Sequence, residues 1–187
     1  MKRLLVLLLV MIGGHAFAAT PLPRDSIYQL DISLTDQGGQ TAMLAQRRGQ
    51  VQVISMFYSS CTMVCPMIVD TMRATRNAVD EPQRDRLGLL LVSFDPARDS
   101  VDALRQYAAR RKLDAPAWTL ARAEPQAARQ LAALLGLQYR QLPDGDFNHS
   151  SELILLDADG RILARSTVIG RLDPPFVEAV KHALGTP

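Results

Sequence analysis

The sequence predicts an α/β domain in which helices cover both faces of a central mixed β-sheet. Two nearly continuous apolar runs, Gln50–Tyr58 and Leu87–Phe94, have the length and the Val/Ile/Leu content of strands that are buried on both faces. Each run is followed by a segment with the apolar spacing of a helix. Two later apolar runs flank the sequence Asp157-Ala158-Asp159-Gly160, which is typical of a hairpin turn. Alternating strands and helices that end in a hairpin indicate both parallel and antiparallel pairing in one sheet.

The N-terminal half of the domain is expected to hold three strands and one helix. Ser26–Leu34 is the first strand candidate, and the run Asp36-Gln37-Gly38-Gly39 that follows it is a turn signal. The strand Gln50–Tyr58 leads into a helix over Pro66–Val79, because a proline in the first turn removes only an N–H group that has no partner there. The third strand, Leu87–Phe94, comes after this helix.

The C-terminal half is expected to hold three helices, a short strand and the hairpin. Asp99 or Ser100 caps the first of these helices, which runs to about Lys112, and Gly136 ends the second. The remaining predicted elements are the helix Glu124–Leu135, the short strand Leu137–Leu142, the hairpin strands Ser151–Leu156 and Arg161–Ser166, and the helix Asp173–Leu184.

Residues 1–18 have the features of a secretory signal peptide. Lys2 and Arg3 precede the apolar run Leu4–Ile12, and Ala16-Phe17-Ala18 supplies small residues at the spacing of a cleavage site. We expect cleavage after Ala18, which leaves residues 19–187 as one domain in the periplasm of a Gram-negative host. The alternative is an uncleaved membrane anchor, although the apolar run is shorter than the roughly 20 residues of a membrane span.

The predicted mature chain is electrically balanced. Removal of Lys2 and Arg3 reduces the 21 basic residues to 19, which equals the 19 acidic residues. A neutral chain without a basic run gives no reason to expect nucleic acid or an anionic membrane as a partner.

The only two cysteines, Cys61 and Cys65, are separated by three residues and lie between the strand Gln50–Tyr58 and its helix. This position is the carboxyl edge of the predicted sheet, where α/β proteins bind ligands, and a helix start lowers the pKa of a nearby thiol. A structural disulfide is the alternative, but a bridge across so short a loop contributes little chain entropy. The spacing favours redox or metal chemistry.

His149 lies just before the hairpin, at the same predicted sheet edge as the cysteines. Two thiolates and one imidazole suit Cu(I) and, with a weak fourth ligand, Cu(II). Structural zinc usually takes four protein ligands, and the chain has no third cysteine. The other histidine of the domain, His182, is expected near a helix C-terminus, where a partial positive charge is favourable. We therefore predict a copper site formed by Cys61, Cys65 and His149.

Three nearby residues, Met63, Asp95 and Asp99, are candidates for supporting roles. Met63, inside the cysteine loop, is positioned to contact copper or the surface of a partner, whereas Met67 is expected in the core. Asp95 and Asp99 follow a central strand and are candidate carboxylates behind the metal ligands. The alternatives are that Asp99 caps a helix and that Asp95 orders the turn at Pro96.

Three motifs together resemble the Sco/SenC copper proteins. They are the C-x-x-x-C-P segment Cys61–Pro66, the D-P-x-x-D segment Asp95–Asp99, and His149 followed by an apolar strand and a D-G turn. The resemblance implies a thioredoxin-like fold, with Cys61, Cys65 and His149 as copper ligands. It also implies delivery of copper to the dinuclear centre of cytochrome c oxidase, on its subunit II. Another periplasmic copper carrier is a second expected partner.

Three other functions are compatible with the same residues. A thiol–disulfide oxidoreductase would use Cys61 as the attacking thiol and Cys65 as the resolving one, as some members of the family do. A peroxidase of the same fold is disfavoured because its threonine-before-cysteine arrangement is missing. A copper or redox sensor would bind the metal without delivering it.

Overall fold

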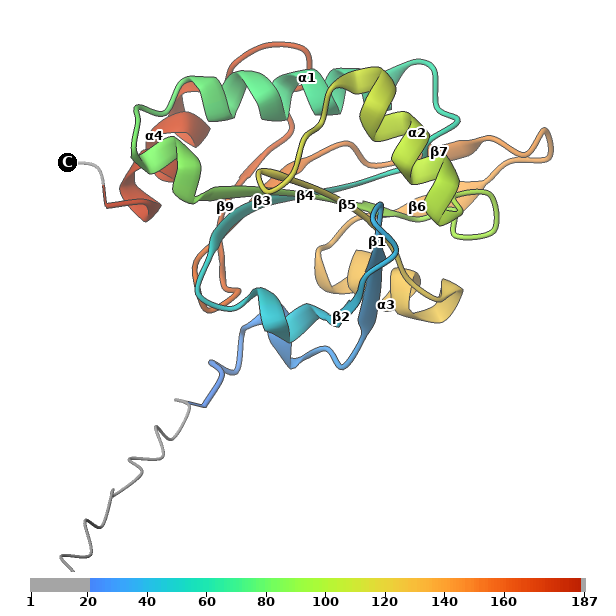
Figure 1. The fold of residues 1–187 in the computed structure, drawn as a ribbon, viewed down its shortest axis with the longest axis horizontal. Helices are drawn as coiled ribbons and strands as arrows, with labels where there is room; N and C mark the ends of the chain where they lie inside the picture. Colours follow the sequence, from blue (N-terminus) through green and yellow to red (C-terminus); the bar gives the residue numbers. More distant parts are fainter. Residues whose placement is uncertain (1–20, 186–187) are drawn as a thin grey trace, which may run out of the picture.

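The computed structural model describes residues 21–185, so the predicted signal peptide lies outside the described residues. A seven-stranded sheet with the order β2-β1-β5-β4-β3-β8-β9 crosses the molecule. Helices α1, α2 and α4 cover one face of this sheet and α3 covers the other (Figure 1). The strands are β1 Ser33–Asp36, β2 Thr41–Met43, β3 Val51–Phe57, β4 Leu87–Ser93, β5 Trp118–Arg122, β8 Leu153–Leu156 and β9 Ile162–Ser166, and the helices are α1 Val64–Asn77, α2 Val101–Arg111, α3 Pro125–Leu134 and α4 Pro174–Ala183.

Strands β3 and β4 form the middle of the core. All seven residues of each strand are buried, and the two strands pair in parallel from Val51 opposite Leu87 to Phe57 opposite Ser93. Parallel neighbours need long crossovers, which α1 supplies between β3 and β4 and α2 supplies between β4 and β5. The residues that follow β3 and β4 therefore lie at one edge of the sheet.

The N-terminal segment is attached at the opposite end of the strands, beside the amino end of β3. The N–H of Gly49, just before β3, donates to Ala158 at 2.7 Å, and the N–H of Ile27 donates to Gly160 at 2.9 Å. A Cβ atom on Gly160 would lie 2.6 Å from the Tyr28 ring, so only glycine fits this turn without displacing the ring. The N-terminal segment therefore packs against the β8–β9 turn, beside the amino end of β3.

The sequence prediction for this N-terminal segment was wrong in its first half. Residues Ile27–Gln29 form a 3₁₀ turn, and β1 begins only at Ser33. The cause is local, because the Ser26 hydroxyl accepts the Tyr28 N–H at 3.0 Å and closes the turn.

Most of the longer predicted elements are confirmed, whereas three short strands were not predicted. Strands β3 and β4, the β8–β9 hairpin and all four helices lie within two residues of the expected bounds. Strand β5 was missed, although it lies between β4 and β1 in the sheet and its Trp118 is buried. Strand β2 was also missed, and so was the short strand that contains His149.

A separate two-stranded sheet stands apart from the main one. Strands β6, Tyr139–Gln141, and β7, Phe147–His149, pair antiparallel, with Tyr139 opposite His149 and Gln141 opposite Phe147. His149 therefore belongs to a hairpin strand and not, as predicted, to a loop that enters the main sheet.

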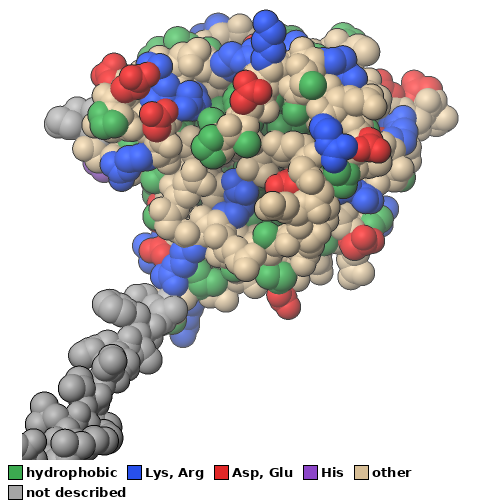
Figure 2. All heavy atoms as spheres, viewed as in Figure 1, with side chains coloured by type: hydrophobic (Ala, Val, Ile, Leu, Met, Phe, Trp, Pro, Cys, Tyr) green, Lys and Arg blue, Asp and Glu red, His purple; other side chains and the backbone are tan. Residues whose placement is uncertain are grey.

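Within residues 21–185, no helix has both the length and the apolar character that a membrane crossing requires. On the face shown in Figure 2, basic and acidic side chains are interspersed.

Candidate metal centre

The cysteine loop connects β3 to α1 and is shaped by its own backbone. The N–H of Cys61 donates to the Tyr58 carbonyl at 3.2 Å, and the N–H of Cys65, in the first turn of α1, points at Cys61 Sγ at 3.4 Å. The sulfur thus receives an N–H group that a side-chain cap would otherwise take, since Met63 at the cap position makes no side-chain hydrogen bond. Both cysteines are buried and neither forms a disulfide.

The β6–β7 hairpin brings His149 to this loop. His149 Nε2 lies 4.0 Å from Cys65 Sγ, and the ligand atoms of Cys61, Cys65 and His149 all lie within 4.8 Å of one another. No other group of three or more His, Cys, Asp or Glu side chains in the described part of the chain has a comparable arrangement. The expectation that the imidazole approaches the cysteine pair is confirmed.

One hydrogen bond determines which nitrogen of His149 faces the sulfurs. Nδ1 lies 2.9 Å from the carbonyl oxygen of Ser150. Because a carbonyl can only accept, Nδ1 carries the proton and donates it. Nε2 is then the nitrogen with a free lone pair, and it is the one directed at Cys65.

The two thiols differ in acidity. Burial raises the pKa of Cys61, but hydrogen bonds from the Cys65 and Met63 backbone and from the Cys65 side chain outweigh it and bring this pKa below 9.0. Burial raises the pKa of Cys65 well above 9.0, and the charges of Cys61 and Asp99 raise it further. Cys61 is therefore the thiol that ionises more readily, whereas Cys65 keeps its proton in the metal-free protein at neutral pH.

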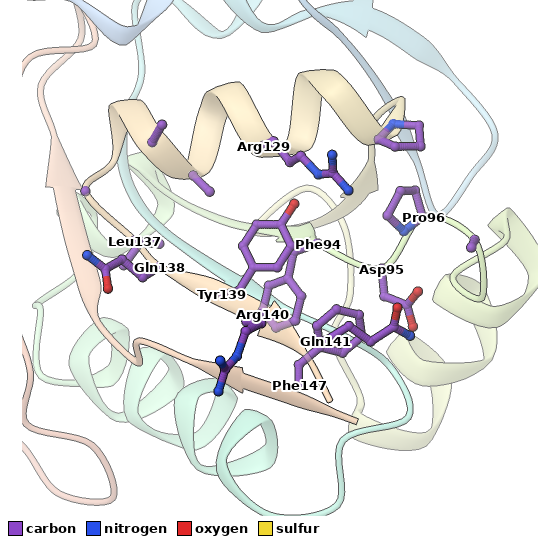
Figure 3. A pocket seen from close by; sticks show the side chains of 15 residues that line it. Phe94, Asp95, Pro96, Arg129, Leu137, Gln138, Tyr139, Arg140, Gln141 and Phe147 are labelled. Carbon is purple, nitrogen blue, oxygen red and sulfur yellow. The ribbon is translucent and has the colours of Figure 1, made fainter. Parts of the chain in front are cut away.

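Aromatic rings pack around the imidazole. The ring of Phe94 lies 4.9 Å from the His149 ring, and Tyr58 meets it edge-on at 5.9 Å. Phe94 also stacks on Tyr139 and contacts Phe147. Phe94, Tyr139 and Phe147 border a groove of about 760 Å³ between α3 and the hairpin (Figure 3). These ring contacts hold the hairpin against the main sheet.

Comparison with known proteins is consistent with this geometry. Residues 23–182 match the family SCO1/SenC. The chain belongs to this family. A protein of Stutzerimonas stutzeri whose name ascribes copper binding to it is 27% identical over 146 residues, which cover 75% of this chain and 69% of that protein.

Solved structures of SCO1/SenC relatives share the fold. Copper-bound ScoI of Bradyrhizobium japonicum superposes with a TM-score of 0.67 at 21% identity, covering 83% of this chain and 97% of that one. BsSco, described as a cytochrome c oxidase assembly protein with a disulfide switch, superposes with a TM-score of 0.67 at 18% identity, covering 84% and 94%. The predicted thioredoxin-like α/β fold is confirmed.

The carboxylate of Asp99 holds the cysteine loop in place by accepting hydrogen bonds. Its fully buried carboxylate accepts the Ser59 N–H at 3.1 Å, the Ser59 hydroxyl, and the Ser93 hydroxyl at 2.5 Å. Burial raises the pKa of Asp99, and the hydrogen bonds from Ser59 and Ser93 oppose that rise. Asp99 therefore ties the loop to β4. The helix cap is Ser100, whose hydroxyl accepts the Ala103 N–H at 3.1 Å.

Asp95 orders the turn after β4, as one of the two sequence interpretations expected. Its backbone carbonyl accepts the N–H groups of Arg98 and Asp99 at 3.1 and 3.0 Å. Its buried carboxylate forms an ion pair with Arg98. Neither Asp95 nor Asp99 belongs to the cluster of candidate ligands among residues 21–185.

The two methionines beside the cysteines are both exposed. Met63 has 79% of its surface exposed, and Met67 has 45%. The prediction that Met67 lies in the core was wrong, because it occupies the outer face of α1, where its methyl group packs over Gly170. Met63 contributes its backbone N–H to Cys61.

Sequence reasoning assigned no role to three residues that contact the site. Tyr58, Phe94 and Phe147 surround His149 or the hairpin that carries it. One signal was available for Phe147, since residues two apart on a strand share a face and Phe147 precedes His149 by two.

Proposed function

We propose that this chain is an exported copper chaperone that holds one copper ion between Cys61, Cys65 and His149. The observation that carries the proposal is that these three donor atoms lie within 4.8 Å of one another, with Nε2 of the imidazole free to bind. Thiolate sulfur and imidazole nitrogen are the donors that copper prefers. Membership of the SCO1/SenC family and the copper bound to the Bradyrhizobium relative support this choice of metal.

The recipient we propose is the dinuclear copper site of cytochrome c oxidase, on subunit II, because the related BsSco is described as an assembly protein of that oxidase. Another periplasmic copper carrier is the proposed source of the ion. His149 borders a surface hollow of about 460 Å³, whereas both cysteines are buried. Incoming ligands of a recipient therefore displace the imidazole first and the thiolates afterwards.

Copper titration of the reduced protein under anaerobic conditions tests this function. We expect one copper per chain, a thiolate-to-Cu(II) absorption band, and at least a tenfold loss of Cu(I) affinity together with loss of the band in His149→Ala. His182→Ala is the matched control, because His182 lies on the exposed side of α4 and should leave both measurements unchanged. Absence of a copper–thiolate signal in the reduced wild type would contradict the proposal.

Thiol–disulfide exchange is a second candidate function, favoured by the unequal acidity of the two thiols. The Cys61 thiolate attacks a target disulfide, forms a mixed disulfide and releases one target thiolate. Cys65 then gives up its proton and attacks the Cys61 sulfur, which closes the Cys61–Cys65 disulfide and releases the second target thiol. Reduction of a disulfide probe would establish this activity if it persists in His149→Ala and is lost in Cys61→Ser.

A further inference from the structure

The position of His149 depends on side chains, because its hairpin lies outside the main sheet. Within residues 21–185, strands β6 and β7 pair with each other, through three residues each, and with no other strand. A two-stranded sheet of this size is marginal on its own in water. Contacts with the body of the protein must therefore hold the imidazole over the sulfurs.

Tyr58 is the side chain that joins the two ligand-bearing segments. It follows β3 directly and precedes Cys61 by three residues, and its hydroxyl donates a hydrogen bond to the carboxylate of Asp146, in the hairpin turn just before strand β7. Its ring packs 5.2 Å from Phe147 and meets the His149 ring edge-on. Tyr58 is 3% exposed, and its ring also packs 5.2 Å from Phe94, so the ring is fixed by its neighbours.

Arg98 fastens the tip of the same hairpin. Its guanidinium donates to the Gly145 carbonyl at 2.6 Å and lies 5.5 Å above the centre of the Phe147 ring. The buried carboxylate of Asp95 fixes the guanidinium from the other side. Arg98 and Tyr58 thus hold neighbouring residues of the hairpin turn, Gly145 and Asp146.

We propose that Tyr58 is a positioning residue for copper binding, which holds His149 over the cysteines through its hydrogen bond to Asp146. This inference rests on the proposed copper site. Loss of the hydrogen bond leaves the cysteines in place, because the core and Asp99 hold their loop, but frees the strand that carries the imidazole. The hydrogen bond also lowers the pKa of Asp146, as expected for a charged acceptor.

The test compares Tyr58→Phe with Tyr107→Phe. Both changes remove one hydroxyl from a buried tyrosine, but the Tyr107 hydroxyl has no hydrogen-bond partner in the described structure and its ring packs on Phe57. In metal-free protein, amide hydrogen exchange of residues 139–149 should speed up about tenfold in Tyr58→Phe only. Copper affinity should fall about tenfold in the same variant, with stoichiometry unchanged.

Asp146→Ala removes the acceptor of the hydrogen bond and keeps the contact between Tyr58 and the Cys61 thiol. If the pair acts as one unit, the double variant with Tyr58→Phe loses no more affinity than either single variant. Because Asp146 is exposed, this variant should fold even if Tyr58→Phe does not, and it then tests the role of the hydrogen bond by itself. Hydrogen exchange in the hairpin that matches wild type in both single variants would overturn the inference.

The outcomes separate this inference from the proposed function. If the wild-type protein binds no copper, the proposed copper site is wrong. The hydrogen-exchange comparison still reports whether Tyr58 holds the hairpin. If the wild type binds copper, and Tyr58→Phe and Asp146→Ala equal it in affinity and exchange, the proposed copper site stands and Tyr58 has no positioning role.

Discussion

The cysteine segment and the histidine hairpin are built in opposite ways. Cys61 and Cys65 follow a strand that is buried along its whole length, and the carboxylate of Asp99 ties their loop to the neighbouring strand. His149 sits on a two-stranded sheet that, among residues 21–185, forms no ladder with the main sheet and is held to it by side chains such as Tyr58 and Arg98. The protein therefore holds two candidate ligands through its main sheet and the third through side chains that contact a small hairpin. The proposed carrier function would use this combination, because a carrier both holds its metal and gives it up.

The largest loss of copper affinity should come from a substitution in the cysteine segment. Cys65→Ala removes the fully buried sulfur, and a two-donor remainder of one thiolate and one imidazole should bind Cu(I) at least a hundredfold more weakly. His149→Ala leaves the dithiolate and should lose less Cu(I) affinity than Cys65→Ala does. Competition with a Cu(I) chelator ranks the Cu(I) affinities of the two variants. A weaker affinity in His149→Ala than in Cys65→Ala would contradict the difference between the cysteine segment and the histidine hairpin.

Removal of an aromatic ring that packs against the β6–β7 hairpin should give the next largest effect. Phe94→Ala deletes a ring that contacts Tyr58, Tyr139, Phe147 and His149, and should cost about 3–5 kcal/mol of unfolding free energy. Phe176→Ala, in α4, removes an equally buried ring and should cost a similar amount.

Only the Phe94 variant should also weaken copper binding at temperatures where both proteins remain folded. Urea unfolding and copper titration, measured side by side on the two variants, separate global stability from positioning of the hairpin. Equal copper affinities in the two variants would show that Phe94 does not help to place the imidazole.

A moderate effect should follow from pH. The pKa of Cys61 is lowered below 9.0 and that of Cys65 is raised above it, and both thiols must lose their protons to bind copper. Between these two pKa values one proton is released for each copper bound, so affinity should rise about tenfold per pH unit. Below the pKa of Cys61 the slope should double. Proton release measured calorimetrically in two buffers checks both slopes, and a flat profile would contradict them.

The smallest effect should come from Met63→Leu. The side chain is largely exposed, and its contribution to Cys61 is a backbone N–H that leucine retains. Equilibrium copper affinity should therefore stay within about twofold of wild type. A larger loss would show that the thioether reaches the metal after all, as one sequence interpretation allowed.

The predictable parts of the molecule are those determined by local pattern. The uninterrupted apolar runs of β3 and β4 indicated buried parallel strands, and their carboxyl ends gave the correct edge for the cysteines. The route of His149 was not predictable in the same way. Its strand is only three residues long and pairs with residues ten or fewer positions earlier, so a propensity argument had nothing to detect.

The contacts of Tyr58 and Asp99 were also beyond the sequence. Each joins residues 40 or more positions apart in the chain, Ser59 to Asp99 and Tyr58 to Asp146. Such pairings depend on tertiary packing. The same reason explains why β5 was missed, since its strand character comes from burial between β4 and β1.

The attachment of the N-terminal segment has a consequence for where the protein can be tethered. Residues Ile27 and Gly49 are bonded to the β8–β9 turn at the amino end of β3, whereas the thiols follow its carboxyl end. Seven residues of extended chain separate these points by about 23 Å. The described chain therefore begins at the end of the strands opposite the thiols. A tether attached to this N-terminal segment would leave the cluster of Cys61, Cys65 and His149 facing away from the attachment point.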